Sequence, residues 1–265
     1  MFQRIRNLTE QCIDFYRYKR LTARVEKPKF LLQQLRAEGY CSQSGQDKWI
    51  IEKLFPGKKN GFFVDIGAND GITFSNTYLL EKMGWNGLAV EPIPSVYDKL
   101  VENRLCRTVN GCVAPVSGKE RFRVITGYPQ MLSGLVDEYD PRHIERINRE
   151  LDSYGGEYTD IEVKCYNFNE LLEGNGIFQV DHLSIDVEGE EYKILNSIDF
   201  NHIHISVIGV ENCYLDLRIP HLLIRRGFAF HSIVGDEFYQ NRKNSLTLIN
   251  LRTPILLYQT GDRPC

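Results

Sequence analysis

The stretch FFVDIGANDGITFSN, residues 62–76, decides the fold. Apolar residues run into Asp65, and Gly67, Asn69 and Gly71 follow at once, ahead of a predicted helix that includes residues 75–84. Glycines between a strand and a helix let a ligand approach the backbone closely. Asn69 tolerates a left-handed backbone better than most residues and can stand where another glycine is expected. The stretch therefore predicts a buried strand that ends in a ligand-binding turn.

Strands and helices alternate on both sides of this stretch. GLAVEP (87–92), DHLSIDVEG (181–189) and HISVIGVEN (204–212) predict buried strands, and each is followed by a helical pattern. Such alternation implies parallel strands joined by right-handed crossovers in an open α/β sheet. Ligands of open sheets bind beyond the carboxyl ends of the strands. The predicted fold class is therefore α/β with a doubly wound, Rossmann-like sheet.

Two segments depart from the alternation. Residues 126–160 carry four tyrosines and a helix-like run, and they predict a lid-like insertion that contacts substrate, with a purely structural excursion as the alternative. Residues 1–40 predict a basic helical arm. Packing on its own domain or on a second subunit of a homo-oligomer is one interpretation of the arm, and peripheral contact with an anionic membrane surface or glycan is the other. Residues 41–265 are expected to form the main domain.

Composition excludes several classes of protein. With 265 residues, 42% of them hydrophobic, the chain has material for one sizeable core. A net charge of -3 argues against a nucleic-acid partner. No apolar run approaches the roughly 18 residues of a transmembrane segment, and the first 20 residues lack the apolar core of a secretory signal. Seven cysteines without a CxxC pair fit reduced thiols, which predicts a cytoplasmic protein.

The acids around the glycine turn favour one cofactor class. Dinucleotide-binding turns typically have the pattern G-x-G-x-x-G, which this turn lacks. In addition, Asp65 and Asp70 would repel a pyrophosphate. This disfavours a nicotinamide oxidoreductase. Glu91 ends the next predicted strand, where it can accept hydrogen bonds from both hydroxyls of a ribose. A cationic nucleoside without phosphates, S-adenosyl-L-methionine, fits this set.

Two blocks together carry a family resemblance. VDIGANDG with the following EP, and then LSIDVEGEEYKIL, make residues 40–250 resemble the FkbM-type family of S-adenosylmethionine-dependent methyltransferases. The resemblance implies the class I methyltransferase fold, with a seven-stranded sheet, and O-methylation in carbohydrate biosynthesis. It implies that the cofactor's methionine end lies against Asp65, Gly67, Asn69, Gly71, Ser75 and Asn76. It also implies that Glu91 binds the ribose and that Cys112 and Val113 flank the adenine.

Further acids end the later strands. Asp186 and Glu188 follow one strand, and Glu211 and Asn212 follow the next, so the four side chains are expected to converge. One interpretation makes Asp186 or Glu188 the general base for an acceptor hydroxyl. The other places Mg²⁺ on Asp186, Glu211 and Asn212, which offer the hard oxygen ligands that this ion prefers. His143 in the insertion is a third catalytic candidate, because a lid can carry it to the substrate.

The leading functional hypothesis is an O-methyltransferase that acts on a hydroxyl of a sugar, a glycan or a similar small polar metabolite. The alternative is a non-catalytic binding or adaptor module that retains the methyltransferase fold. The presence of Asp65, Glu91, Asp186 and Glu188 favours the enzyme, because a site that has decayed is expected to lose some of these acids.

Overall fold

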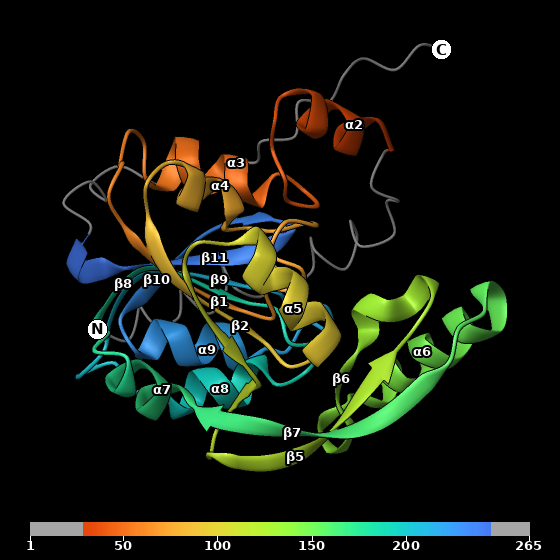
Figure 1. Cartoon of the computed structure of the whole chain (residues 1–265). Helices are drawn as coiled ribbons and strands as arrows, with labels where there is room; N and C mark the ends of the chain where they lie inside the picture. The colour runs from red at the N-terminus through yellow and green to blue at the C-terminus, as the bar shows by residue number, and fades with distance from the viewer. Residues whose placement is uncertain (1–28, 245–265) are drawn as a thin grey trace.

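A computed structural model describes residues 29–244, and these residues form a central sheet covered by helices on both faces (Figure 1). The sheet has seven strands in the order β10-β11-β9-β8-β1-β2-β3. Their bounds are β1 (Phe62–Ile66), β2 (Asn86–Glu91), β3 (Arg107–Asn110), β8 (Gln179–Ile185), β9 (His204–Val210), β10 (Phe228–Val234) and β11 (Asp236–Asn241). The predicted seven-stranded α/β sheet is confirmed.

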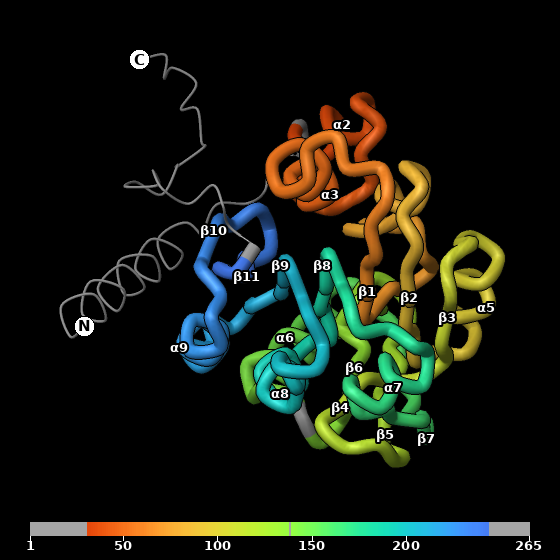
Figure 2. Tube along the Cα trace, turned by 90° about the vertical axis from the view of Figure 1, so that its left-hand side faces the viewer, coloured from red at the N-terminus to blue at the C-terminus, as the bar shows by residue number. Residues whose placement is uncertain are grey.

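Pairing in the sheet is parallel except at one strand. β1 pairs in parallel with β2 and β8, and the pairs β2–β3 and β8–β9 are also parallel. β11 runs antiparallel to both β9 and β10. Figure 2 shows the sheet from the side, with β10 and β11 at one edge and β3 beside α5 at the other. The carboxyl ends of β1, β2, β8 and β9 therefore meet at one edge of the molecule, as the sequence predicts.

Side chains of the central strands alternate between two helical layers. Val64 and Ile66 of β1 lie in the large core with the helices that follow β7, β8 and β9, whereas Phe63 lies in the core of the opposite face. The first layer contains α7 (Phe168–Gly174), α8 (Glu191–Ser197) and α9 (Arg218–Arg225). The second contains α3 (Gln46–Trp49), the π-helix η1 (Ile50–Leu54), α4 (Tyr78–Lys82) and α5 (Pro94–Asn103). Burial on both faces explains why these strands read as continuous apolar runs.

A second sheet interrupts the crossover from β3 to β8. Its strand order is β4-β7-β5-β6, and β5 and β7 pair antiparallel along a long ribbon. The strands are β4 (Cys112–Ala114), β5 (Gly118–Ile125), β6 (Gly134–Leu135) and β7 (Tyr158–Asn167). Two 3-10 helices, η2 (Tyr128–Leu132) and η3 (Val136–Glu138), and helix α6 (Pro141–Tyr154) lie between β5 and β7. The predicted insertion at 126–160 is thus the outer part of a longer excursion, in which α6 confirms the predicted helix.

The predicted N-terminal arm is described only at its end. Helix α2 (Lys29–Ala37) agrees with the expected helical character, whereas the basic positions of the arm lie outside the described residues. Contact of the arm with a membrane, glycan or second subunit therefore remains a prediction. Within residues 29–244, no helix combines the length and the apolar character needed to cross a membrane.

Candidate functional site

The glycine turn at residues 67–71 is built for close approach of the backbone. Gly67 has φ of 86°, and a Cβ at this position would lie 1.9 Å from the carbonyl oxygen of Asp186. The two segments are this close because the Asp186 amide donates a hydrogen bond to the Ile66 carbonyl. Asn69 has φ of 50°, which confirms the left-handed geometry predicted for it. The turn therefore joins the ends of β1 and β8 with no room for a side chain at Gly67.

Glu91, the last residue of β2, holds this turn in place. Its carboxylate accepts hydrogen bonds from the Asn69 amide at 3.0 Å and from the Ile93 amide at 2.9 Å. Burial raises the pKa of Glu91 to about 7, although these amides oppose the shift. Each carboxylate oxygen has a second lone pair. Glu91 thus lies beside the turn, as predicted, with acceptor capacity left for a ligand hydroxyl.

Asp65 faces the helix that follows the turn. Thr77 donates its hydroxyl to Asp65 at 2.5 Å, and the Arg104 guanidinium donates to the same Thr77 oxygen at 3.1 Å. Arg104 also forms a buried ion pair with Glu81 at 3.0 Å. Burial raises the pKa of Asp65, and Arg104 opposes that shift. The contacts that surround Asp65 therefore fasten α4 and α5 to the end of β1, at one side of the predicted cofactor position.

Ser75 and Asn76 differ in what they offer a ligand. The Ser75 hydroxyl accepts from the amides of Thr77 and Tyr78, at the start of α4. The Asn76 amide group donates to Asp236 at 2.9 Å and to Ser184 at 3.2 Å. Its carbonyl oxygen is buried without a hydrogen-bond partner among the described residues. Asn76 therefore presents an unsatisfied acceptor close to the strand ends, and such an oxygen calls for a donor.

Cys112 and Val113 open β4, immediately after Gly111, whose amide donates to the Glu91 carbonyl at 3.0 Å. Both side chains are buried. Val113 belongs to the main core, and Cys112 lies in register with Cys165 of β7. The two residues are thus close to Glu91 in the fold, and their predicted contact with an adenine remains a prediction.

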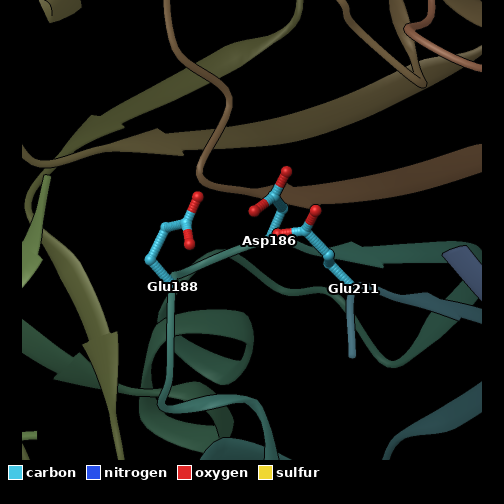
Figure 3. Close-up of side chains that lie close together, drawn as sticks. All are labelled: Asp186, Glu188 and Glu211. Carbon is cyan, nitrogen blue, oxygen red and sulfur yellow. The ribbon is translucent and has the colours of Figure 1, made fainter. Parts of the chain in front are cut away.

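Three carboxylates converge at the ends of β8 and β9. Asp186 and Glu188 follow β8, Glu211 follows β9, and each offers an oxygen within 4.8 Å of the other two. Figure 3 shows the three side chains turned toward the same space. We call this group the carboxylate cluster. The convergence predicted for these three acids is confirmed.

The environment of the carboxylate cluster favours bound protons. Water reaches the exposed Asp186 side chain, yet the surrounding protein, followed by the Glu211 and Glu188 carboxylates, raises its pKa well above the ordinary value. Burial and then the Glu211 carboxylate raise the pKa of Glu188 well above its ordinary value. Glu188 also has φ of 59°, a strained value for a residue other than glycine. Raised pKa values and backbone strain are both concentrated at functional sites.

Asn212 makes hydrogen bonds within the loop after β9 and to β11. Its side-chain NH₂ donates to Glu237 at 3.0 Å, and its side-chain oxygen accepts from the Asp216 amide at 2.7 Å. These bonds shape the loop that follows β9. Glu188 lies beside Asp186 and Glu211 in the carboxylate cluster, and the predicted role of Asn212 as a metal ligand remains a prediction.

Helix α6 brings His143 to the carboxylate cluster. The ring is fully buried, with Nε2 3.0 Å from the Leu132 carbonyl and Nδ1 2.8 Å from the Tyr214 hydroxyl. Glu188 Oε2 lies 3.4 Å from Nδ1. Burial lowers the pKa of His143. The insertion therefore delivers His143 to Glu188, as a lid would, but the buried ring contacts Glu188 and Tyr214 and does not face open space.

Sequence reasoning missed two residues that shape the site. Met131 of η2 places its sulfur 3.5 Å from the side-chain Nδ2 of Asn69, so the insertion contacts the glycine turn as well as the cluster. Tyr214 joins the loop after β9 to His143. A signal existed for the neighbourhood of Tyr214, because the pattern Asp-x-Arg occurs at residues 140–142 and again at 216–218. The sequence carries no comparable signal for Met131.

Comparisons with known proteins agree with this geometry. A family model described as "Methyltransferase FkbM domain" matches residues 65–230. "Methyltransferase 1" of Beauveria bassiana (strain ARSEF 2860) is 27% identical over 165 residues, which are 58% of this chain and 66% of that protein. The match thus spans just under two-thirds of the fungal relative's length.

Two solved structures are similar at a lower level. Methyltransferase FkbM from Methylobacillus flagellatus KT aligns with a TM-score of 0.46 and 10% identity, over 88% of this chain and 60% of that one. A TehB-like SAM-dependent methyltransferase from Corynebacterium glutamicum aligns with a TM-score of 0.38 and 12% identity, over 79% of this chain and 94% of that one. Because both TM-scores are below 0.5, the fold assignment rests on the chain's own strand order. The family model, in contrast, covers more than half of the chain and includes both the glycine turn and the carboxylate cluster, and the chain therefore belongs to the family of methyltransferases with an FkbM domain.

Proposed function

We propose that this chain is an S-adenosylmethionine-dependent O-methyltransferase that acts on a hydroxyl of a sugar, a glycan or a similar polar acceptor. The observation that carries the proposal is the contact between the glycine turn and the main chain of Asp186, whose side chain belongs to the carboxylate cluster. Gly67 and Asp186 are so close that a single methyl group does not fit between them. Groups suited to hold a methyl donor and groups suited to take a hydroxyl proton thus share one strand edge.

The residues of the turn fit the proposed cofactor. Gly67 lets the turn pass directly against the Asp186 carbonyl, Asn76 offers a buried and unsatisfied acceptor, and Glu91 is aimed at the turn. An ammonium group is a suitable donor for an unsatisfied oxygen. The acids around the turn favour a positively charged nucleoside over a pyrophosphate. When bound there, S-adenosylmethionine supplies an electrophilic methyl group on a sulfonium.

The carboxylate cluster suits the task of taking a proton. An alcohol is a poor nucleophile until its proton leaves, and a general base works best with a pKa near the operating pH. Burial and mutual repulsion raise the pKa values of Asp186 and Glu188. We assign proton acceptance to the cluster, in which Asp186 is the residue whose main chain contacts the glycine turn. His143 is a positioning residue in this scheme, because it reaches the acceptor only through Glu188 and Tyr214.

A divalent cation is a second candidate for the same position. Three carboxylate oxygens within 4.8 Å of one another can ligate Mg²⁺, which would stabilise the alkoxide that forms from the acceptor. Dialysis against EDTA separates the two schemes. Turnover that persists supports proton transfer to a free carboxylate, whereas turnover that is lost and returns with Mg²⁺ establishes the metal.

The enzymatic assignment is tested by transfer of a labelled methyl group. The chain is incubated with S-adenosylmethionine labelled in the methyl group and with a set of hydroxyl-bearing glycans. We expect label in an alkali-stable ether, together with an equal amount of S-adenosylhomocysteine. Tight binding of the cofactor without transfer to any acceptor in a broad glycan set would support the adaptor hypothesis instead.

A further inference from the structure

A cavity of about 430 Å³ lies beside the carboxylate cluster, and none of the residues that line it belongs to the glycine turn. It forms where the loop after β8, the loop after β9 and the start of α6 meet, and both Glu188 and Glu211 line it. This volume falls in the range of small-molecule sites. The outer wall of this cavity, which lies opposite Glu188 and Glu211, has no role in the proton transfer proposed above.

Two matching Asp-x-Arg units form that outer wall. Asp140 accepts two hydrogen bonds from the Arg142 guanidinium, at 2.8 and 2.6 Å, and Asp216 holds Arg218 in the same way, at 2.9 and 2.6 Å. Each unit also caps a backbone amide, because Asp140 accepts from the Arg142 amide and Asp216 from the Arg218 amide. Each arginine is therefore oriented by an aspartate two residues before it, one in the insertion and one in the loop that leads to α9.

Each arginine also lies over a tyrosine ring that lines the cavity. Arg142 is 4.9 Å from the Tyr214 ring centre, and Arg218 is 4.2 Å from that of Tyr192. Each side of the cavity thus has a tyrosine ring beside a planar guanidinium group that donates hydrogen bonds. Aromatic rings and planar polar groups together suit the apolar faces and vicinal hydroxyls of a sugar.

The charge of the lining is unsuited to an acidic ligand. Arg142 and Arg218 are neutralised by their aspartates, and Lys193 lies 3.7 Å from Glu190. Three further carboxylates, Glu188, Glu191 and Glu211, line the inner wall. A phosphate, sulfate or carboxylate in this cavity would lose its hydration and meet cations that are already paired with carboxylates. A neutral or amine-bearing ligand meets no such penalty.

Backbone strain marks the same cavity. Glu188 and Leu215, which both line it, have φ of 59° and 58°. They are two of four residues other than glycine with positive φ in the described chain. Strained backbone at a ligand site indicates that the loops are held in place for a purpose other than stability. Asn212 holds one of these loops, through the Asp216 amide.

We propose that this cavity is the acceptor site and that it takes a carbohydrate unit that carries no acidic group, either neutral or amine-bearing. The inference rests on the methyltransferase function proposed above. The Asp-Arg pairs and tyrosines bind the sugar at the rim, and its reacting hydroxyl points to Glu188 and Glu211. The hydroxyl oxygen bonds to the methyl carbon as the carbon–sulfur bond breaks, and the hydroxyl proton passes to a carboxylate of the cluster.

Ligand-observed NMR with saturating S-adenosylhomocysteine tests this proposal. The probes are three sets of oligosaccharides of matched length: neutral glucose oligomers, glucosamine oligomers and galacturonate oligomers. We expect a neutral or amine-bearing oligomer to bind at least tenfold more tightly than the acidic one. Arg218→Ala should weaken that binding at least tenfold and leave S-adenosylhomocysteine affinity unchanged. Arg225→Ala, at the exposed end of the same helix, is the matched control.

Each other outcome is decisive. Tightest binding of the acidic oligomer, or binding that is unaffected by Arg218→Ala, overturns the proposal. If no oligomer binds while S-adenosylhomocysteine does, the carbohydrate class is wrong and the methyl-donor function stands. If S-adenosylhomocysteine itself does not bind, the proposed function fails first. Should Arg218→Ala unfold, Tyr192→Leu provides the same test, because it removes the ring on which Arg218 lies.

Discussion

At the scale of single residues, Asp186 is the member of the carboxylate cluster whose main chain contacts the glycine turn. Asp186→Asn keeps the size of the side chain but removes its ability to accept a proton as a carboxylate. We expect turnover to fall by ~10²–10⁴-fold, the usual contribution of a general base, while the affinity for S-adenosylhomocysteine is unchanged. Initial-rate kinetics and calorimetry measure the two effects separately. Asp152→Asn, on the exposed side of α6, is the control, and a wild-type rate in Asp186→Asn would remove Asp186 from the catalytic role.

Glu91 is predicted to contribute to cofactor binding and not to the proton transfer. Glu91→Gln replaces a carboxylate that accepts two backbone hydrogen bonds, at 3.0 and 2.9 Å, with an amide that accepts through one atom. We expect S-adenosylhomocysteine affinity to fall about tenfold, because a hydrogen bond to a charged group contributes about 1.5–3 kcal/mol. Calorimetric titration beside an exposed control, Glu102→Gln, measures the difference. Equal affinities in Glu91→Gln and wild type would contradict the ribose role.

At the scale of elements, the insertion is fastened to the main sheet through α6. His143 Nε2 lies 3.0 Å from a carbonyl, which only accepts, so Nε2 carries the proton and Nδ1 accepts from the Tyr214 hydroxyl. Tyr214→Phe deletes that donor, and the net loss of such a bond is about 1 kcal/mol. We expect hydrogen exchange in α6 to quicken roughly fivefold, the factor that corresponds to 1 kcal/mol, while β8 stays unchanged.

Tyr154→Phe, at the exposed end of α6, is the matched control for this experiment. It removes a hydroxyl from the same helix without touching His143. Equal exchange rates in α6 for Tyr214→Phe and wild type would show that the hydroxyl does not fasten the insertion. A uniform rise over the whole chain would indicate a global effect instead.

At the scale of the whole molecule, buried acids link stability to pH. Burial raises the pKa of Glu190 from 4.5 to about 7, and one of its oxygens has no hydrogen-bond partner in the part of the chain that the structure describes. Between these two pKa values the folded state binds more protons than the unfolded state. The free energy of unfolding therefore falls as pH rises through this window.

Glu190→Gln removes the carboxylate whose ionisation lowers the free energy of unfolding at high pH. We expect the variant to equal wild type near pH 4 and to exceed it at pH 8 by on the order of 2–3 kcal/mol, with part of the gain offset by the loss of the nearby Lys193 ion pair. Urea denaturation at several pH values measures the difference, with exposed Glu102→Gln as a flat control. A constant difference at all pH values would rule out titration of Glu190 as the cause.

The sequence predicted the main sheet and much of the site for one physical reason. Fully buried parallel strands read as apolar runs, and the residue that ends each run lies at the functional edge, so Glu91, Asp186, Glu188 and Glu211 were identified from position alone. The left-handed geometry of Asn69 followed from its residue type. Strand ends are thus the most predictable part of this site.

Contacts between distant segments were not predictable. Residues 118–121 of β5 are exposed, so that strand has no buried apolar run. Its antiparallel partner is distant in sequence, because Gly118 pairs with Cys165, 47 residues further along the chain. Asp65 was expected to face the cofactor, but Arg104 joins its partner Thr77 from the end of another helix. Asn212 is diverted by Glu237, which lies on β11. These partners depend on packing, which spacing in one sequence does not encode.

The central claim is that the strand edge at Gly67 and Glu91 holds a methyl-donor nucleoside. Calorimetric titration of the whole chain with S-adenosylhomocysteine, and separately with NAD, tests it most directly. We predict one S-adenosylhomocysteine per chain, no detectable NAD binding, and a stabilisation against thermal unfolding of about 2.7 kcal/mol at a ligand concentration of about 100 times the Kd. Binding of NAD, or the absence of S-adenosylhomocysteine binding to a folded chain, would contradict the account.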